Sequence, residues 1–165
     1  MTDVVNAANV TDSTPAASEG PAASDDPAWR RLRLAALVFG VGSAVHVVDH
    51  LRRGQGSTSD ELLWAGNAAL VLQVVIITLV ATRHRLAPLW GAAAGLTLAV
   101  GFTNAHWLPD WSPLSDPVWQ VDSLPVLTAV ASAVEVVGAF AVGLTGLAIV
   151  RRDGLASFGT PRATA

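Results

Sequence analysis

Long apolar stretches alternate with short polar segments along this chain. Four such stretches cover residues 32–50, 62–82, 87–107 and 124–150. They are rich in Ala, Leu and Val and lack the two-residue alternation that is typical of β-strands. A hydrocarbon core of about 30 Å needs roughly 20 helical residues at about 1.5 Å each, and every stretch meets this length, the first one narrowly. The pattern therefore predicts an all-α membrane protein with four transmembrane helices.

Helix-end signals flank these stretches. Segment 58–61 has the form of a capping box, with Thr58 three residues before Glu61, and it predicts the start of the second helix. Pro88 and Pro125 fall in the first turns of the third and fourth helices, where a missing N–H costs little. Pro109 is expected to end the third helix. The Trp residues all lie at or just beyond the ends of stretches, as expected of aromatic belts at the two membrane surfaces.

The basic residues predict an orientation. All ten are Arg. Eight of them precede the first stretch, lie between the second and third, or follow the fourth, and would share one side of the membrane. Only Arg52 and Arg53 fall on the other side. Cytoplasmic segments carry the excess of positive charge in membrane proteins. We therefore expect both termini to be cytoplasmic, with the helices forming an antiparallel up-down bundle in a bacterial plasma membrane.

The amino-acid composition also supports a membrane protein, whose helices face lipid instead of water. Only 14% of the residues are charged and 52% are hydrophobic, whereas soluble domains carry about 25% charged residues. The absence of Cys excludes disulfides and thiolate chemistry, and no basic patch interleaved with aromatics supports nucleic-acid binding. The expected partners are the bilayer, a second copy or another membrane protein.

The two ends of the chain differ from its apolar centre. Residues 1–28 contain five acids, no base and few large apolar side chains, and this composition predicts a disordered acidic tail. Residues 29–152 form the predicted transmembrane domain. Residues 153–165 are expected to be a flexible C-terminal tail.

The first stretch ends in a group of chemically capable residues. His46, Asp49 and His50 are spaced at i, i+3 and i+4, so they share one helix face, and two such histidines can reach one metal ion. Counting helical rise places His106 at the depth of His50, near the outer boundary, with Asp110 just beyond. If the first and third helices are neighbours, these five residues form an outward-facing cluster that binds a divalent metal such as zinc.

A second polar layer is predicted near mid-membrane. Counting helical rise brings Ser43, Gln73, Thr97 and Glu135 to similar depths. An ionised carboxylate there costs at least about 2.5 kcal/mol on insertion scales. We therefore expect Glu135 to be protonated, hydrogen-bonded to Gln73, or paired with a histidine such as His46.

Two motifs resemble a group of known sequences. The segments HVVDHLRRG (residues 46–54) and AHWLPDWS (residues 105–112) are similar to uncharacterised small four-helix integral membrane proteins of high-GC bacteria. The resemblance covers roughly residues 30–150. It implies a four-helix membrane domain and no particular activity.

Several functions remain open from the sequence. The first is a metal-binding membrane protein, for which a non-enzymatic role is favoured over catalysis. If the protein is an enzyme, it would use metal-activated water with a carboxylate as base. The second is electron transfer by a b-type haem held between His50 and His106. The third is proton-coupled transport through Glu135, Gln73 and His46. The fourth is an accessory subunit of another membrane protein.

Overall fold

The chain is helical throughout the part that the structure describes. The computed structural model describes residues 26–159, which form α1 (Pro27–Arg53), α2 (Asp60–Ala81), α3 (Ala87–Trp107), α4 (Pro125–Asp153) and the short α5 (Ala156–Gly159). Two 3-10 turns, η1 (Gln55–Ser57) and η2 (Val118–Gln120), lie in the connections. No strand occurs within these residues, so the predicted all-α class is confirmed.

Three helices are long and apolar enough to cross a membrane. They are α1, α2 and α4, with 27, 22 and 29 residues. With 21 residues α3 is also long enough, but it is not among these candidate spans. Its glycines and polar residues such as Asn104 and His106 dilute its apolar character. Length and composition therefore support three of the four predicted spans.

Most predicted helix ends agree with the structure. Both α3 and α4 carry a proline in the first turn, and α3 ends two residues before Pro109. The predicted cap of α2 was wrong by one residue. Ser59, rather than Thr58, is the N-cap, and its hydroxyl accepts a hydrogen bond of 3.1 Å from the N–H of Leu62.

The predicted tails lie partly outside the described residues. The disorder expected of the acidic tail and the flexibility expected of the C-terminal tail fall mainly on residues 1–25 and 160–165, which are outside the described part. Within it, α1 begins at Pro27 and α5 covers residues 156–159, so both predicted tails contribute helical residues. Asp26 caps α1 by accepting a hydrogen bond from the N–H of Ala28.

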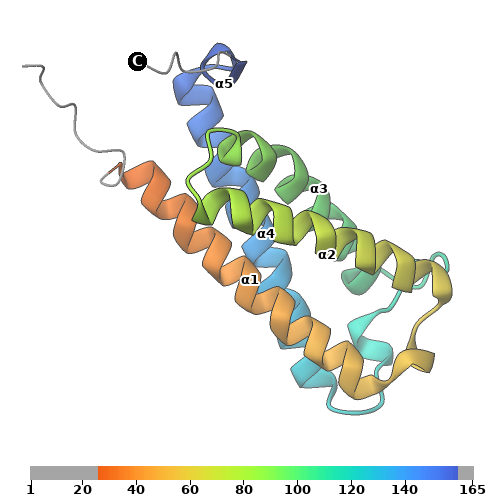
Figure 1. Cartoon of the computed structure of the whole chain (residues 1–165). Helices are drawn as coiled ribbons and strands as arrows, with labels where there is room; N and C mark the ends of the chain where they lie inside the picture. The colour runs from red at the N-terminus through yellow and green to blue at the C-terminus, as the bar shows by residue number, and fades with distance from the viewer. Residues whose placement is uncertain (1–25, 160–165) are drawn as a thin grey trace, which may run out of the picture.

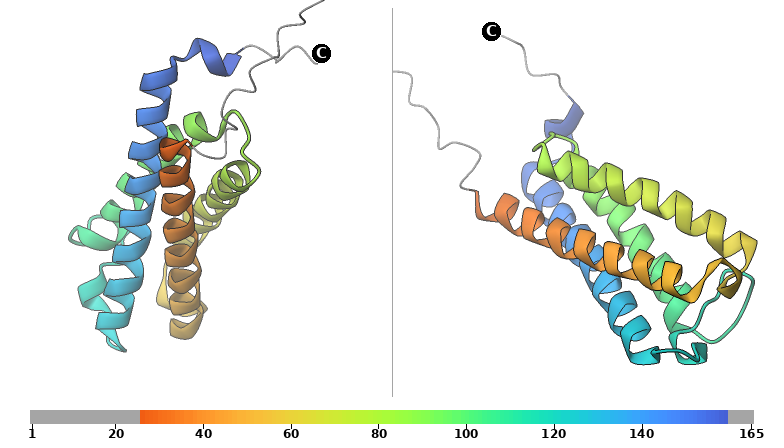
Figure 2. Two further views of the ribbon diagram at one scale, coloured as in Figure 1. Left: turned by 90° about the vertical axis from the view of Figure 1, so that its left-hand side faces the viewer. Right: turned by 60° about the horizontal axis from the view of Figure 1, so that its bottom comes forward.

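The connections gather at the two ends of the helices. The start of α1, the turn between α2 and α3, and the end of α4 lie at one end, and the α1–α2 and α3–α4 connections lie at the other (Figures 1 and 2). At the first end Arg152 forms an ion pair of 2.8 Å with Asp26. The Arg152 guanidinium, helped by the Ala28 amide, holds the pKa of Asp26 below its usual value. This pair joins the start of α1 to the end of α4.

Helix α4 is the centre of the packing. Both α1 and α3 pack along it, whereas α2 makes far fewer contacts with its neighbours. The buried residues of α2 are Gln73, Ile76 and Val80, and none of residues 60–72 is buried. Figure 1 shows α2 close to α1 near the α2–α3 turn and apart from it at the other end. The half of α2 that follows η1 is therefore the loosely packed part of the fold.

Glycines allow α4 to approach its two neighbours closely. A Cβ at Gly42 would lie 2.7 Å from the backbone N of Glu135, and one at Gly138 would lie 2.6 Å from the Cα of Phe39. A Cβ at Gly146 would lie 2.6 Å from the carbonyl oxygen of Pro88 on α3. Small residues at such crossings let helix backbones pack without side chains between them. The α1–α4 crossing brings Glu135 beside Gly42, one turn from His46.

We expect Gly138→Ala to lower stability although alanine favours helix. The new methyl would meet the Phe39 backbone, which cannot rotate away, and such overpacking costs about 1–3 kcal/mol. Gly66→Ala is the matched control, because a Cβ there has no atom within 4 Å. Thermal unfolding of detergent-purified protein should show Gly138→Ala melting below, and Gly66→Ala at or above, the parent protein. Equal melting of the two variants would contradict the close crossing.

Candidate metal centre

Three histidines converge at the end of the helices that holds the α1–α2 and α3–α4 connections. His46 and His50 lie one turn apart on α1, and His106 lies in the last turn of α3. One nitrogen from each ring can be chosen so that all three lie within 4.8 Å of one another. Zinc–nitrogen bonds of about 2.0–2.1 Å place tetrahedral donors roughly 3.4 Å apart, so binding an ion requires these side chains to rotate. The three imidazoles are therefore positioned to share one ion.

The helices that carry these histidines meet through their side chains. The backbones of α1 and α3 pack mainly on α4, while the rings of His46 and His106 have centroids 4.7 Å apart. The His46 and His50 centroids are 4.6 Å apart, and those of His50 and His106 are 6.0 Å apart. The predicted meeting of histidines from the first and third helices is confirmed at the level of the imidazoles.

A backbone carbonyl orients His106. Its Nδ1 lies 3.0 Å from the carbonyl oxygen of Asp116, and the N–H of Asp116 donates to the carbonyl of Ala105 at 2.8 Å. Since a carbonyl only accepts, Nδ1 carries the proton and Nε2 keeps its lone pair. Metal-binding histidines are typically held in this way, with the second nitrogen bonded to a carbonyl or carboxylate. His106 is therefore set up to bind an ion through Nε2.

A buried arginine joins the histidines to two carboxylates. Arg53 donates to both carboxylate oxygens of Asp116, at 3.0 and 2.7 Å, and its Nε lies 3.3 Å from Asp49. Its Nη2 also lies 2.9 Å from Nδ1 of His50, whose Nε2 lies 2.9 Å from Nε2 of His46. Arginine only donates, so hydrogen bonds run from Arg53 through His50 to His46. An ion bound by Nε2 of both rings would replace the bond between these two histidines, and because the His50 proton would then lie on Nδ1, it would also displace the hydrogen bond from Arg53.

Neither of the two predicted aspartate ligands belongs to the group of side chains that could share an ion. Asp49 is buried but accepts hydrogen bonds from Arg52 and from the hydroxyl of Thr128 on α4, at 2.8 Å each. Asp110 is exposed and is not part of the group that could share an ion. Two other carboxylates approach the histidines: Oδ2 of Asp116 lies 3.8 Å from Nδ1 of His106, and Oε2 of Glu135 lies 3.8 Å from Nε2 of His46.

Sequence reasoning missed Arg53 and Asp116 as members of this site. One signal was available. Arg52 and Arg53 are the only arginines predicted on the extracytoplasmic side of the membrane, where the positive-inside rule expects few. Arginines at that position need a local reason, and both pair with Asp49. The pairing of Arg53 with Asp116 depends on how the α3–α4 connection folds back, which no spacing in the sequence indicates.

Three residues of the predicted polar layer, Ser43, Gln73 and Glu135, are buried. Nε2 of Gln73 donates to Oε1 of Glu135 at 2.8 Å, and Nε2 of His46 lies 3.8 Å from Oε2 of Glu135. Both expected partners of Glu135 are therefore adjacent to it, and Ser43 is buried nearby on α1. Thr97 lines the cavity that adjoins Gln73 and Glu135, but it is exposed, and its hydroxyl donates to the carbonyl of Ala93 on its own helix. Helical rise predicts the depth of a side chain but not which partner it bonds.

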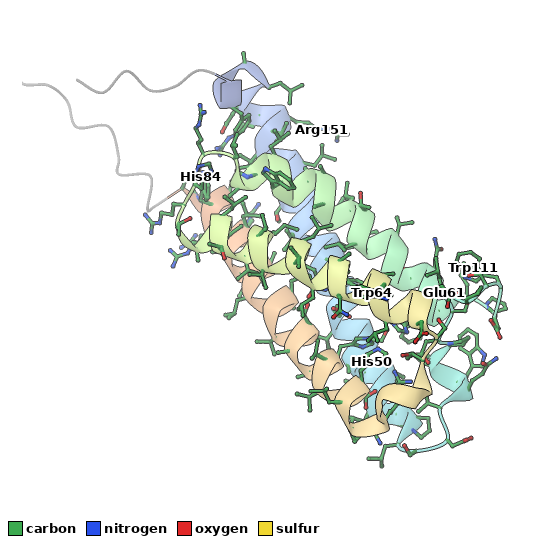
Figure 3. The ribbon with its side chains drawn as sticks, turned by 45° about the vertical axis from the view of Figure 1, so that its right-hand side comes forward. His50, Glu61, Trp64, His84, Trp111 and Arg151 are labelled. Atoms are coloured by element: carbon green, nitrogen blue, oxygen red, sulfur yellow. The ribbon has the colours of Figure 1, made fainter. Side chains whose placement is uncertain are left out.

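A cavity of about 1070 Å³ adjoins the histidines and the Gln73–Glu135 pair. It lies beside the loosely packed half of α2, and its walls are mostly apolar; they include Leu62, Leu72, Leu98, Phe102, Trp111 and Leu114. Within the described residues, His46 Nδ1, Gln73 Oε1 and Glu135 Oε2 are buried without a hydrogen-bond partner. Figure 3 shows His50 and Trp111 toward the end of the molecule opposite His84 and Arg151.

Comparisons with known proteins leave the site to be interpreted from its own chemistry. No protein-family model matches the sequence, and neither curated proteins nor solved structures gave a significant match. The structure defines the class as a helical protein with three apolar helices of membrane-spanning length and a histidine cluster that could hold a metal ion.

Proposed function

We propose that this chain is a multi-pass membrane protein that binds one divalent metal ion, zinc by preference, through His46, His50 and His106. In this proposal α1 to α4 form a four-helix bundle in the bilayer, with α3 as the fourth span. Both termini are cytoplasmic, in keeping with the arginine distribution. The histidines then lie at the extracytoplasmic end of the bundle.

One observation carries the proposal: three imidazole nitrogens from two helices lie within 4.8 Å of one another. Imidazole suits Zn, Cu, Ni and Fe, whereas Mg and Ca prefer oxygen donors. Three histidines with an open fourth position are a common arrangement of zinc outside purely structural sites. The oriented His106 adds support, because its Nε2 needs no further change of protonation to bind an ion.

The charges near the histidines suit a dication. Arg52 and Arg53 are balanced by Asp49 and Asp116 through ion pairs of 2.7–3.3 Å. Glu135 remains as the neighbouring carboxylate that no arginine pairs within the described residues. Binding of M²⁺ would therefore be compensated chiefly by Glu135.

Metal analysis of detergent-purified protein, prepared without a metal-affinity column, tests the proposal. We expect about one zinc per chain, bound by the three imidazoles. Cobalt should replace zinc and give the visible absorption of a four-coordinate site. Absence of stoichiometric metal after incubation with zinc, cobalt and nickel in turn would refute the proposal.

The same geometry argues against a haem held by His50 and His106. Two axial imidazoles must lie on opposite faces of a porphyrin, with the flat ring between them. The ring of His46 has its centroid 4.6 Å from that of His50 and 4.7 Å from that of His106. It therefore occupies the space that a porphyrin would need, and a single ion is the better match.

A further inference from the structure

We propose that the cavity beside the histidines binds an amphiphile with one hydrocarbon chain and a hydroxyl-bearing head group, such as a monoacylglycerol. The head group would donate hydrogen bonds to Gln73 and Glu135, and the chain would lie along α2 and α3. A carboxyl oxygen accepts a hydrogen bond whether the group is ionised or protonated, so this inference goes beyond the proposed metal site and does not depend on it.

The size and lining of the cavity match this class of ligand. Its volume of about 1070 Å³ is at the upper end of the roughly 300–1,000 Å³ of ligand pockets. The lining extends from Leu62 to Gln73 along α2, which is roughly 16 Å at about 1.5 Å per residue. One extended chain therefore fits along α2.

The polar end of the cavity specifies a donor. Gln73 and Glu135 are each more than nine-tenths buried, and one oxygen of each has no hydrogen-bond partner within the described residues. The amide of Gln73 already donates to Glu135, so its oxygen is left as an acceptor. Buried acceptors without partners are unfavourable. A hydroxyl satisfies them, whereas a methyl ester has no proton to donate.

The route of entry favours a lipid-like molecule over a water-soluble one. None of residues 60–72 of α2 is buried, and α2 diverges from α1 at this end (Figure 1). In a bilayer, this side of the cavity is covered by lipid rather than by protein. An amphiphile already in the membrane can therefore enter sideways between α2 and its neighbours.

Photolabelling in nanodiscs tests this inference on the full chain. The probe is a monoacylglycerol with a diazirine in a 16-carbon chain, and mass spectrometry locates the labelled residues. We expect labelling to concentrate on segments 62–73 and 97–106, which line the cavity. Excess 1-palmitoylglycerol should remove it, and methyl palmitate should not. Equal competition by the two would refute the hydroxyl recognition, and labels spread over all helices would refute the site.

Two glycine variants separate cavity binding from general insertion into lipid. Gly101 lines the cavity, and a Cβ at this position would have no atom within 4 Å, so Gly101→Phe places a ring in open space there. Gly56→Phe is the control, since Gly56 also has free space but does not line the cavity. We expect Gly101→Phe to lower cavity labelling by about tenfold and Gly56→Phe to leave it unchanged. Equal labelling in both would overturn the inference.

Zinc content is measured on the same preparations. If the protein contains zinc but 1-palmitoylglycerol does not reduce the cavity labelling, the proposed amphiphile is refuted and the metal proposal stands. Competed labelling without zinc would refute the metal proposal, while the cavity remains a binding site for the amphiphile.

Discussion

Replacing His106 by alanine is expected to lower the zinc affinity of the purified protein by at least about 100-fold. Loss of groups that merely orient a metal ligand already costs about 10–100-fold in affinity. His106 is the only one of the three histidines contributed by α3. Without it the remaining donors, His46 and His50, lie one turn apart on α1 and supply only two of the three imidazole ligands.

Competition between the protein and a zinc chelator gives the affinity, and His84→Ala is the control. His84 lies in the turn between α2 and α3, at the opposite end of the molecule (Figure 3), where its Nδ1 accepts a hydrogen bond from the N–H of Leu86. We expect His84→Ala to bind zinc as the parent protein does. A His106→Ala variant with unchanged affinity would contradict the three-histidine site.

Replacing Arg53 by alanine is expected to destabilise the protein by about 3–5 kcal/mol, the usual result of removing one partner from a buried ion pair. The Arg53 side chain is only 5% exposed and contacts Asp49 and Asp116, which are themselves almost fully enclosed. Asp49 would keep its bonds to Arg52 and Thr128. Asp116 would lose its arginine and leave an uncompensated carboxylate beside the histidines.

The neighbouring variant Arg52→Ala is the control. The Arg52 side chain is 28% exposed, and pairs that water reaches contribute about 0–1 kcal/mol. Chemical unfolding in detergent should therefore rank Arg53→Ala well below Arg52→Ala in stability. The double variant Arg53→Ala with Asp116→Asn should lose less than the sum of the two single changes, because the second change removes the stranded charge. Equal destabilisation by Arg53→Ala and Arg52→Ala would contradict the buried network.

Much of the helical framework could be predicted because its causes are local. The apolar stretches gave α3 its observed limits of residues 87–107, and the prolines marked the starts of α3 and α4. Helix α1 proved longer than its apolar stretch of residues 32–50, because arginine-bearing turns continue the helix at both ends. The capping residue of α2 was misplaced by one position, since Thr58 and Ser59 are chemically similar caps.

The positions of the site residues along their helices could be predicted, but the set of residues that form the site could be predicted only in part. Rise per residue depends on the helix alone, so counting along the chain correctly brought His106 to the level of the α1 histidines and Gln73 to that of Glu135. Thr97 was assigned to the polar layer by the same count and lines the same cavity as Gln73 and Glu135, but its hydroxyl bonds its own helix instead of either residue. The rotation of each helix about its axis is decided by packing against other helices, and the depth of a residue along its helix gives no information about that rotation.

The sequence by itself determined the apolar helices, most of their ends and the depth of the histidines, because these follow from hydrophobic length and helical rise. Only the tertiary structure decided which groups meet. Close α4 crossings at Gly42 and Gly138 bring Glu135 toward His46. The fold of the α3–α4 connection makes Asp116, instead of Asp110, the carboxylate that joins Arg53 to the histidines. Such contacts join residues far apart in the chain, and their geometry depends on packing that no local pattern encodes.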